Sequence, residues 1–482
     1  MRRTLHGRRS VRIAAGLLAA GLALSACGSS SKGGSSGGSS GGSSGGSSGS
    51  VPGADALDKA SGVVNLTFWH SMKDTNQKAV TAIVDAFNTK YQGKIHVTDT
   101  YQGSYDDAIA KYKTAVSSHT TPSLMQVYDV GTRFMVDSKQ TIPVADLASK
   151  DGYALGDLQP NIVNYYSVGG KLQSMPFNSS MPLLYINVEA FKKAGLDPAN
   201  PPKTLDELAD AAKKLTVKDA NGTTTQYGFG AADYGWFVEQ LTAESGALYC
   251  DNDNGRTARA TKLNLDSGAP LTYTKWWSDL VKGGYASNTG RPTADAQAAF
   301  KAGKVAMNLE STGVLGGYVD AGTKAAAPFT VATAAFPKVT AADSGGPVIG
   351  GASLWIDRAG HSDAEVRAAW EFAKFAASAP QQAAWHQATG YFPVSVAALQ
   401  DPTDVAYRQK HPQFQTAIDE LTATKPSTAT AGCLLGVMPQ ARADLEQAML
   451  NVATTGTTAE AALADASTKI AKLISDYNSA VG

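Results

Sequence analysis

The stretch Val64-Asn65-Leu66-Thr67-Phe68-Trp69 begins the part of the sequence that decides the fold. Val64, Leu66 and Phe68 alternate with the other three residues, which is the two-residue period of a β-strand. Four apolar residues between Val80 and Phe87 then recur at i, i+3, i+4 and i+7, the pattern of one helix face.

Strand and helix patterns continue to alternate along the chain. We expect a second strand over 94–100, a second helix over 105–116 and a third strand over 123–128. This β-α-β-α-β order predicts an α/β fold with a parallel, doubly wound sheet. Ligands of such sheets bind beyond the carboxyl ends of the strands, at a topological switch point.

A second region follows Pro176. We expect a strand over 183–186, and Thr204-Leu205-Asp206-Glu207 has the form of a capping box that begins a helix. The glycine-rich residues 345–351 lead into an apolar strand that ends at Ile356, where we expect the chain to return to the first region. The roughly 430 residues after the N-terminal part exceed what one hydrophobic core usually holds, which predicts two lobes.

The N-terminal sequence predicts export. Five arginines precede the apolar run 13–24, and Leu24-Ser25-Ala26-Cys27 follows, so residues 1–27 have the layout of a signal peptide. The apolar run is too short to cross a bilayer. The cysteine resembles the lipidated residue of bacterial lipoproteins, although an ordinary signal peptide with an incidental Cys27 is the alternative. Residues 28–50 are Gly and Ser apart from Lys32, which predicts a flexible tether to the outer face of a cell membrane.

The charge of the mature chain limits its partners. Five of the 42 Lys and Arg residues lie in residues 1–27, which hold no acid, so 37 basic residues face 42 acidic ones, a net charge of −5. This balance argues against nucleic acid or an anionic membrane surface as the main partner. The two cysteines outside the signal, Cys250 and Cys433, either form a disulfide or remain as two buried thiols.

Motifs for catalysis or metal binding are missing from the sequence. Gly303-Lys304 is followed by Val305, without the Ser or Thr that a Walker A motif needs to bind magnesium. The histidines do not have the spacing of a helical zinc site. Residues 251–255 are only faintly similar to a calcium loop, and a polar turn is the simpler interpretation. An enzyme is therefore unsupported.

Several strings in order along the chain carry a resemblance to a known family. They are Phe68-Trp69-His70-Ser71-Met72, Tyr101-Gln102-Gly103-Ser104-Tyr105, residues 126–132 (QVYDVGT), residues 176–180 (PFNSS), residues 191–198 (FKKAGLDP), residues 349–355 (IGGASLW), residues 385–391 (WHQATGY) and Met438-Pro439-Gln440 with Arg442. Together they resemble the extracellular solute-binding proteins of bacterial ABC importers, and within them the branch that binds glycerol-3-phosphate or glycerophosphodiesters.

The resemblance implies a type II periplasmic-binding-protein fold, in which each lobe is a mainly parallel sheet flanked by helices and crossover segments form a hinge. It also implies a monomeric receptor with no cofactor, no metal and no catalytic residue, which delivers its ligand to permease and ATPase subunits. The expected domains are a signal peptide at 1–27, a tether at 28–61, an N-terminal lobe at 62–176 and 314–357, and a C-terminal lobe at 177–313 and 358–482.

The resemblance also implies a ligand site in the cleft between the lobes. A phosphate favours a guanidinium fork, hydroxyl donors and close approach to glycine N–H groups, whereas glycerol hydroxyls favour a carboxylate acceptor. The expected binding residues are Tyr105, Asp129, Ser180, Trp236, Ser311 (with Thr312 as an alternative), Gly350, Gly351, Tyr391 and Arg442.

Two departures from the family pattern bear on the ligand. Asp129 stands where the family usually has glutamate, and Asp233-Tyr234-Gly235-Trp236 keeps only one tryptophan of a usual pair. Loss of a ring and gain of a charge lead us to expect a glycerophosphodiester such as glycerophosphocholine, with its choline near Trp236 and Asp233. The alternatives are a receptor for di- or oligosaccharides, an extracellular hydrolase of lipid head groups, and a surface adhesion or scaffold protein.

Overall fold

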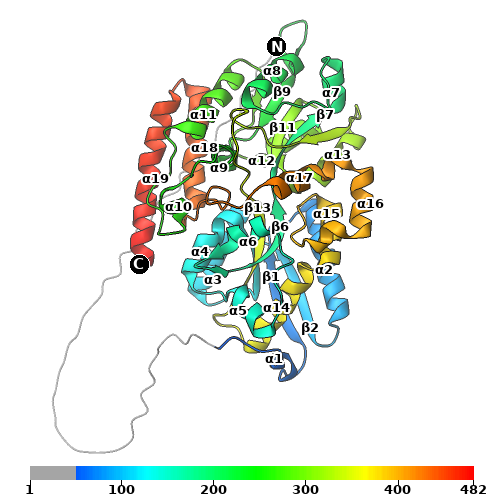
Figure 1. The fold of residues 1–482 in the computed structure, drawn as a ribbon, viewed down its shortest axis with the longest axis vertical. Helices are drawn as coiled ribbons and strands as arrows, with labels where there is room; N and C mark the ends of the chain where they lie inside the picture. Colours follow the sequence, from blue (N-terminus) through cyan, green and yellow to red (C-terminus); the bar gives the residue numbers. More distant parts are fainter. Residues whose placement is uncertain (1–49) are drawn as a thin grey trace, which may run out of the picture. The chain divides into compact units, whose positions relative to one another are not determined.

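Two β-sheets, each flanked by helices, form the framework of the protein (Figure 1). The computed structural model describes residues 50–482. The expected signal peptide, the lipidation site Cys27 and the tether up to residue 49 lie outside the described residues.

The first sheet has five strands in the order β2-β1-β3-β13-β6. Its strands are β1 (Val64–His70), β2 (Ile95–Tyr101), β3 (Leu124–Tyr128), β6 (Met175–Ser180) and β13 (Gly350–Ile356). β1 pairs in parallel with β2 and β3, whereas β13 runs antiparallel to β3 and β6. Val64, Leu66 and Phe68 of β1 are buried, as their alternation predicts.

The second sheet has the strand order β10-β9-β11-β7-β12, and β8 pairs with β9 beside this path. Its strands are β7 (Pro182–Asn187), β8 (Val217–Lys218), β9 (Thr224–Ala231), β10 (Ala286–Asn288), β11 (Val305–Ser311) and β12 (Val331–Ala334). β9 is parallel to β10 and β11, and β7 is antiparallel to β11 and β12. A separate two-stranded pair is formed by β4 (Ser167–Val168) and β5 (Lys171–Leu172).

The helices divide according to the sheet that they contact. Against the first sheet lie α2 (Asp74–Lys90), α3 (Tyr105–Ser118), α6 (Pro160–Tyr166) and α14 (Asp363–Ala376). Against the second lie α7 (Val188–Lys193), α8 (Leu205–Leu215), α11 (Gly268–Lys282), α12 (Thr293–Lys301) and α13 (Leu315–Lys324). Among the other helices are α1 (Asp55–Asp58), α4 (Thr132–Ser138), α5 (Val144–Asp151), α9 (Gly235–Glu244), α10 (Asp251–Gly255), α15 (Ala379–Thr389), α16 (Pro402–Lys410), α17 (Thr416–Ala423), α18 (Met438–Thr455) and α19 (Ala459–Val481).

Local sequence explains where two of these helices begin. The side chain of Ser104 accepts a hydrogen bond from the backbone of Asp107, and the Asp107 carboxylate accepts one from the backbone of Ser104, so a complete capping box begins α3. Thr204 caps α8 as expected, but the carboxylate of Glu207 accepts from the backbone of Lys203. Both caps satisfy backbone N–H groups that a helix leaves without partners.

The two-lobed α/β fold is confirmed, but the expectation of mainly parallel sheets is wrong. Both sheets mix parallel and antiparallel pairs because β6, β7, β12 and β13 belong to segments that cross between the sheets. β13, with which the chain returns to the first sheet, runs antiparallel to both of its neighbours, β3 and β6.

The expected domain boundaries differ from the structure at three places. The tether was expected to reach residue 61, yet Val51 and Leu57 pack against the core under the first sheet. β12 pairs in the second sheet although 314–357 was assigned to the first lobe. α14 contacts β1 although 358–482 was assigned to the second lobe. We therefore propose that both lobes are built from more segments of the chain than the boundaries assumed.

Two crossovers connect the sheets close to each other. β6 and β7 are separated by one residue, Met181, whose backbone N–H donates to Oγ1 of Thr312 (3.3 Å) and whose carbonyl accepts from the Thr312 N–H (2.8 Å). Residues 335–349 connect β12 to β13, and the side chain of Gln240 bonds both the N–H and the carbonyl of Val348. These contacts fix the backbone where the two sheets meet.

A disulfide and a left-handed turn anchor α10. Cys250 is bonded to Cys433. The next residues, Asn252, Asp253 and Asn254, have φ values of 51°, 54° and 58°, so the segment similar to a calcium loop is a left-handed turn. Asn and Asp tolerate this conformation better than other side chains. Within residues 50–482 no group of three or more His, Cys, Asp or Glu side chains is arranged to hold a metal ion.

Loss of the disulfide should lower stability. The bond closes a loop with a sequence separation of 183 residues, and a cross-link over a loop of this order stabilises the folded chain by about 3–5 kcal/mol. We expect the double variant Cys250→Ser/Cys433→Ser to unfold at lower urea concentration than the oxidised wild type, as monitored by circular dichroism. Wild-type protein under reducing conditions is the control and should match the variant. Equal midpoints for oxidised wild type and variant would contradict the expectation.

Candidate functional site

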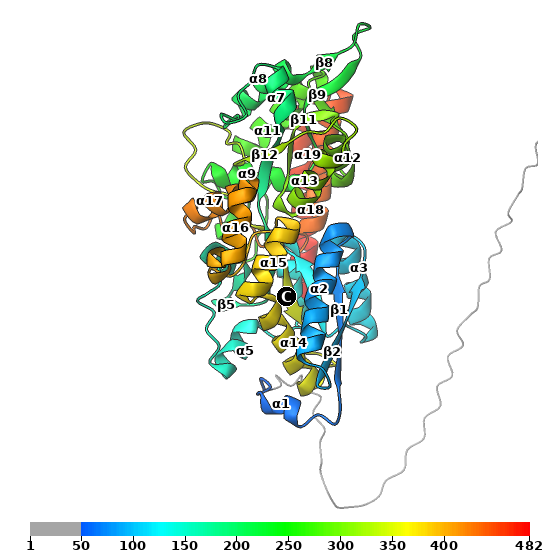
Figure 2. The ribbon, with the colours of Figure 1, turned by 90° about the vertical axis from the view of Figure 1, so that its right-hand side faces the viewer.

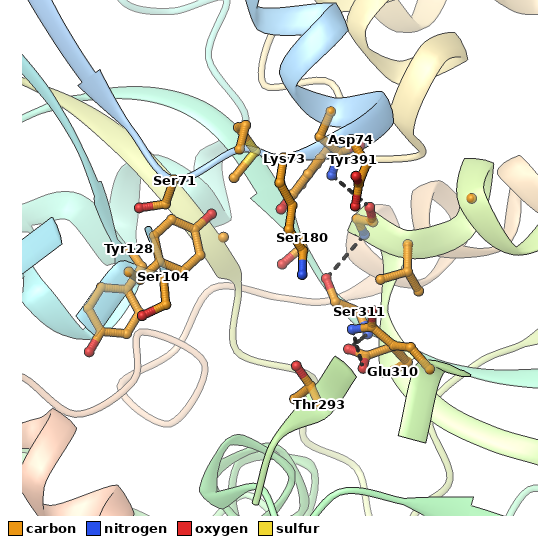
Figure 3. A pocket seen from close by; sticks show the side chains of 18 of the residues that line it. Ser71, Lys73, Asp74, Ser104, Tyr128, Ser180, Thr293, Glu310, Ser311 and Tyr391 are labelled. Atoms are coloured by element: carbon orange, nitrogen blue, oxygen red, sulfur yellow. Dashed lines mark hydrogen bonds between the residues drawn. The ribbon is translucent and has the colours of Figure 1, made fainter. Parts of the chain in front are cut away.

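The main candidate site is a cavity of about 370 Å³ between the two sheets. From the first sheet, residues at the carboxyl ends of β1, β2 and β3 line it, and from the second, residues at the end of β11 and the starts of α9 and α12. Figure 3 shows that these side chains converge from several elements. The cavity therefore lies where the parallel strand order predicts a ligand site.

Most of the expected binding residues lie at this cavity. They are Tyr105, Asp129, Ser180, Trp236, Ser311, Gly351 and Tyr391. Gly350 and Arg442 are not among its lining residues. Thr312, the alternative to Ser311, is fully buried and accepts the bond from Met181 described above, so Ser311 is the one that faces the cavity.

A relay of hydrogen bonds positions Tyr105. The side chain of Gln126 accepts from the backbone of Ser71 (2.8 Å) and donates to Asn178 (2.8 Å), and Asn178 donates to the hydroxyl of Tyr105 (3.0 Å). The Tyr105 ring stacks on that of Tyr128 at 5.1 Å. The Tyr105 hydroxyl is therefore held at the cavity between Asn178, from which it accepts, and the hydroxyl of Tyr391, which also lines the cavity.

Hydrogen bonds to neighbouring residues orient the side chain of Ser311. Its Oγ accepts from the backbone N–H of Gly313 (3.1 Å), and its own N–H donates to Glu310 (2.7 Å). The Ser311 hydroxyl proton thus remains available at the cavity. Tyr391 lies across Gly313, where a Cβ atom would come within 2.5 Å of the tyrosine ring, so only glycine fits there.

Gly350 and Gly351, adjacent in β13, are needed for different steric reasons. Gly351 has a φ of +85°, and a Cβ there would lie 1.9 Å from the carbonyl oxygen of Asn178. Gly350 instead provides a flat surface under Trp236, because its Cβ would lie 2.4 Å from the indole ring. Gly350 therefore shapes the cavity through Trp236 and does not line it.

Arg442 is engaged by protein carboxylates in this structure. Its Nε and Nη2 donate to the two oxygens of Glu239 at 2.6 and 2.9 Å, and Nη2 also donates to Asp129 at 3.3 Å. The side chain is buried, with the guanidinium 5.6 Å from the ring centre of Tyr234. The fork that we expected to hold a phosphate is occupied by Glu239.

Arg442, Glu239 and Asp129 form a charged triad that leaves a net negative charge beside the cavity. Burial raises the pKa of Asp129 to about 6, with Arg442 acting in the opposite direction and Glu239 adding to the rise. At neutral pH, the single positive charge of Arg442 therefore meets two carboxylates. Asp129 is held by Arg442 at the cavity wall, where it can accept hydrogen bonds from ligand hydroxyls.

The expectation for Asp233 is wrong. Its side chain is fully buried and does not line the cavity. Its carboxylate accepts from the indole N–H of Trp277 (2.6 Å), since Asp233 packs against α11. A choline group at the cavity could contact the ring of Trp236 but would not meet the carboxylate of Asp233.

Sequence reasoning missed several polar residues of the cavity. They are Lys73, Asp74, Thr293, Gln297, Lys301 and Glu310. Lys73 directly follows a quoted string at the end of β1, and its place beyond a strand end was a usable signal. Glu310 gives no sequence signal; burial raises its pKa to about 7.

Residues 82–416 match the family model described as bacterial extracellular solute-binding protein. The chain belongs to this family. It is a solute-binding protein of the ABC-transporter type, and such proteins bind a small molecule and work with permease and ATPase subunits. Among residues 50–482, no helix has both the length and the apolar character required to cross a membrane.

The relatives of this solute-binding protein include receptors named for glycerol-3-phosphate. The sn-glycerol-3-phosphate-binding periplasmic protein UgpB of Escherichia coli K12 is 32% identical over 418 residues, which is 85% of this chain and 92% of that protein. The protein of the same name from Brucella melitensis is 32% identical over 82% of this chain and 90% of its own.

Two solved structures show the same fold. UgpB from Mycobacterium tuberculosis in complex with glycerophosphocholine has a TM-score of 0.72 and 22% identity, covering 86% of this chain and 99% of that one. The GacH receptor of Streptomyces glaucescens, solved unliganded and with acarbose, has a TM-score of 0.70 and 20% identity over the same shares.

Removal of Arg442 should destabilise the folded protein. In Arg442→Met, the buried Glu239 and Asp129 lose their shared counter-charge, and the free energy of unfolding should fall by about 3–5 kcal/mol. The double variant Arg442→Met/Glu239→Gln should recover part of this loss, since one buried charge is gone. Urea unfolding measures both. Unchanged stability with lost ligand affinity would show that Arg442 serves the ligand instead.

Asp233 should make stability depend on pH. Its pKa of about 6, raised by burial from 3.8, means that the folded protein keeps a proton that the unfolded chain has lost. The contribution of Asp233 to the free energy of unfolding should therefore fall as pH rises from about 4 to about 6. Asp233→Asn lacks this component, so its stability relative to wild type should rise by up to about 1.4 kcal/mol per pH unit in that window. Urea unfolding across this range tests it, and a constant difference would disprove it.

Proposed function

We propose that this protein captures a glycerophosphodiester, such as glycerophosphocholine, or sn-glycerol-3-phosphate, and delivers it to the permease of an ABC importer. The observation that carries the proposal is the convergence of residues from both halves of the chain on one cavity. These residues are Tyr105, Asp129, Ser180, Ser311, Gly351 and Tyr391.

The chemistry of the cavity supports such a ligand. Hydroxyl groups of Ser311 and Ser180 offer protons to phosphate oxygens, while Asp129 offers an acceptor to glycerol hydroxyls. Curated relatives at 32% identity are named for sn-glycerol-3-phosphate. The aromatic rings of Trp236 and Tyr234 lie beside the negatively charged triad, a surrounding that suits a choline cation.

A saccharide is the second candidate. The cavity is lined by three acids, Asp74, Asp129 and Glu310, and by aromatic rings, which are also the groups that sugars contact. A solved structure with the same fold contains acarbose. A hydrolase of lipid head groups is a weaker alternative, because the family consists of transport receptors.

We further propose that the receptor acts as a monomer outside the cytoplasm, anchored by a lipid on Cys27. The family is extracellular, and the named relatives are periplasmic. The signal layout that ends in Leu24-Ser25-Ala26-Cys27 supports the anchor.

Calorimetric titration of the purified protein tests the ligand class. We expect binding of glycerophosphocholine or glycerol-3-phosphate and no heat from disaccharides. Ser311→Ala removes one donor and should weaken the affinity by roughly three- to tenfold. Ser475→Ala, on the exposed side of α19, is the matched control and should bind as wild type. Sugar binding without any response to glycerophosphates would establish the saccharide alternative.

A further inference from the structure

An organophosphate brings at least one negative charge into the cavity, and the structure limits which cation can meet it. Arg442 donates its Nε and Nη2 to Glu239, and Nη2 also to Asp129. With both carboxylates ionised, the triad carries a net negative charge. A phosphate placed against the triad would be repelled, because charges interact strongly at a buried site.

Two basic side chains line the cavity in the described part of the chain, Lys73 and Lys301. Lys301 lies on α12 and its ammonium group is 5.8 Å from the ring centre of the buried Tyr318. Burial raises the pKa of Glu310, and the positive charge of Lys301 acts in the opposite direction. Lys301 therefore already interacts with an acid of the protein. The ammonium group of Lys301 therefore interacts with Tyr318 and Glu310 of the second lobe.

Lys73 has different surroundings. It is the residue between β1 and α2, and in Figure 3 its side chain extends into the cavity. Within residues 50–482, the ammonium groups of Lys73 and Lys301 both lack a carboxylate within 4.0 Å, unlike that of Lys171, so the two lysines differ in where they point and not in ion pairing. The start of α2 adds the partial positive charge of a helix N-terminus on the same side.

We propose that Lys73 is the residue that contacts the phosphate of the ligand and makes the receptor select anionic over neutral solutes. This inference rests on the proposed function and names the cation that the proposed site uses. Ser180 and Ser311, which line the same cavity, supply the neutral donors. Arg442 then positions Asp129 and does not contact the phosphate.

Asp74 provides a second test of the same site, in which removal of a charge should strengthen phosphate binding. It follows Lys73, lines the cavity and has a φ of 52°, a conformation that asparagine tolerates as well as aspartate. If the phosphate lies beside Lys73, the negative charge of Asp74 weakens its binding. Removal of this charge should therefore strengthen it.

The experiment compares charge variants by calorimetry with glycerophosphocholine, glycerol-3-phosphate and maltose as probes. Lys73→Gln should weaken binding of both phosphate compounds about ten- to a hundredfold, whereas Lys73→Arg should stay within a few fold of wild type. Asp74→Asn should tighten binding by roughly two- to fivefold. Lys78→Gln, the same change at an exposed position on α2 outside the cavity, should bind as wild type.

A chemical readout independent of affinity accompanies the titration. Bound glycerophosphocholine should protect Lys73, but not Lys78, from acetylation by an amine-reactive reagent, measured by mass spectrometry. Normal phosphate binding by Lys73→Gln, without protection of Lys73 in the wild type, would overturn the assignment and leave the proposed function standing. Wild-type protein that binds maltose and neither phosphate compound would overturn both.

Discussion

The single-residue crossover at Met181 is the constraint on which the rest of the structure depends. β6 ends at Ser180 in the first sheet and β7 begins at Pro182 in the second, so the two sheets are joined with no loop between them. The bonds between Met181 and Thr312 then place the end of β11 beside this junction. As a result, Ser180 and Ser311 line one cavity although they belong to different sheets.

A buried charge network is the second organising feature. Arg442 comes from α18, Glu239 from α9 and Asp129 from the end of β3, so one guanidinium joins elements of both lobes. Burying three charges is costly unless they are paired and hydrogen-bonded, and here the pairing is extensive. The network holds Asp129 at the cavity wall and makes that wall electronegative, which shapes what the cavity can bind.

The sequence predicted the parts of the fold that depend on local patterns. Alternation in β1, the helical spacing in α2 and the caps of α3 and α8 all involve residues close together in the chain. The strand directions in β7 and β13 were not predictable in this way, because they follow from crossovers between segments more than a hundred residues apart. The cavity lies at the carboxyl ends of β1, β2 and β3, where the predicted β-α-β-α-β order places a ligand site, and that order was read from strand and helix patterns that are each local.

Sequence reasoning named several residues that line the cavity, but it did not foresee how the charged residues nearby are paired. Family resemblance brought Tyr105, Ser311 and Tyr391 to the cavity, where the structure also places them. It could not show that Glu239, 203 positions away from Arg442, would take the guanidinium fork, or that Trp277 would bury Asp233. Such pairings decide whether a charged residue faces the ligand or another side chain.

Charges of both signs at one cavity favour a ligand that itself has distinct polar ends. A neutral sugar would remove water from Lys73 without bringing a negative charge to it. The free-energy cost of this desolvation grows as water leaves a closing cleft. A phosphate near Lys73 would offset that cost, and hydroxyl groups near Asp129 would use the acceptor that Arg442 holds in place. In the proposed function, the charges of Arg442, Glu239 and Asp129 would repel a phosphate and Lys73 would attract it, so an organophosphate would have one orientation in the cavity.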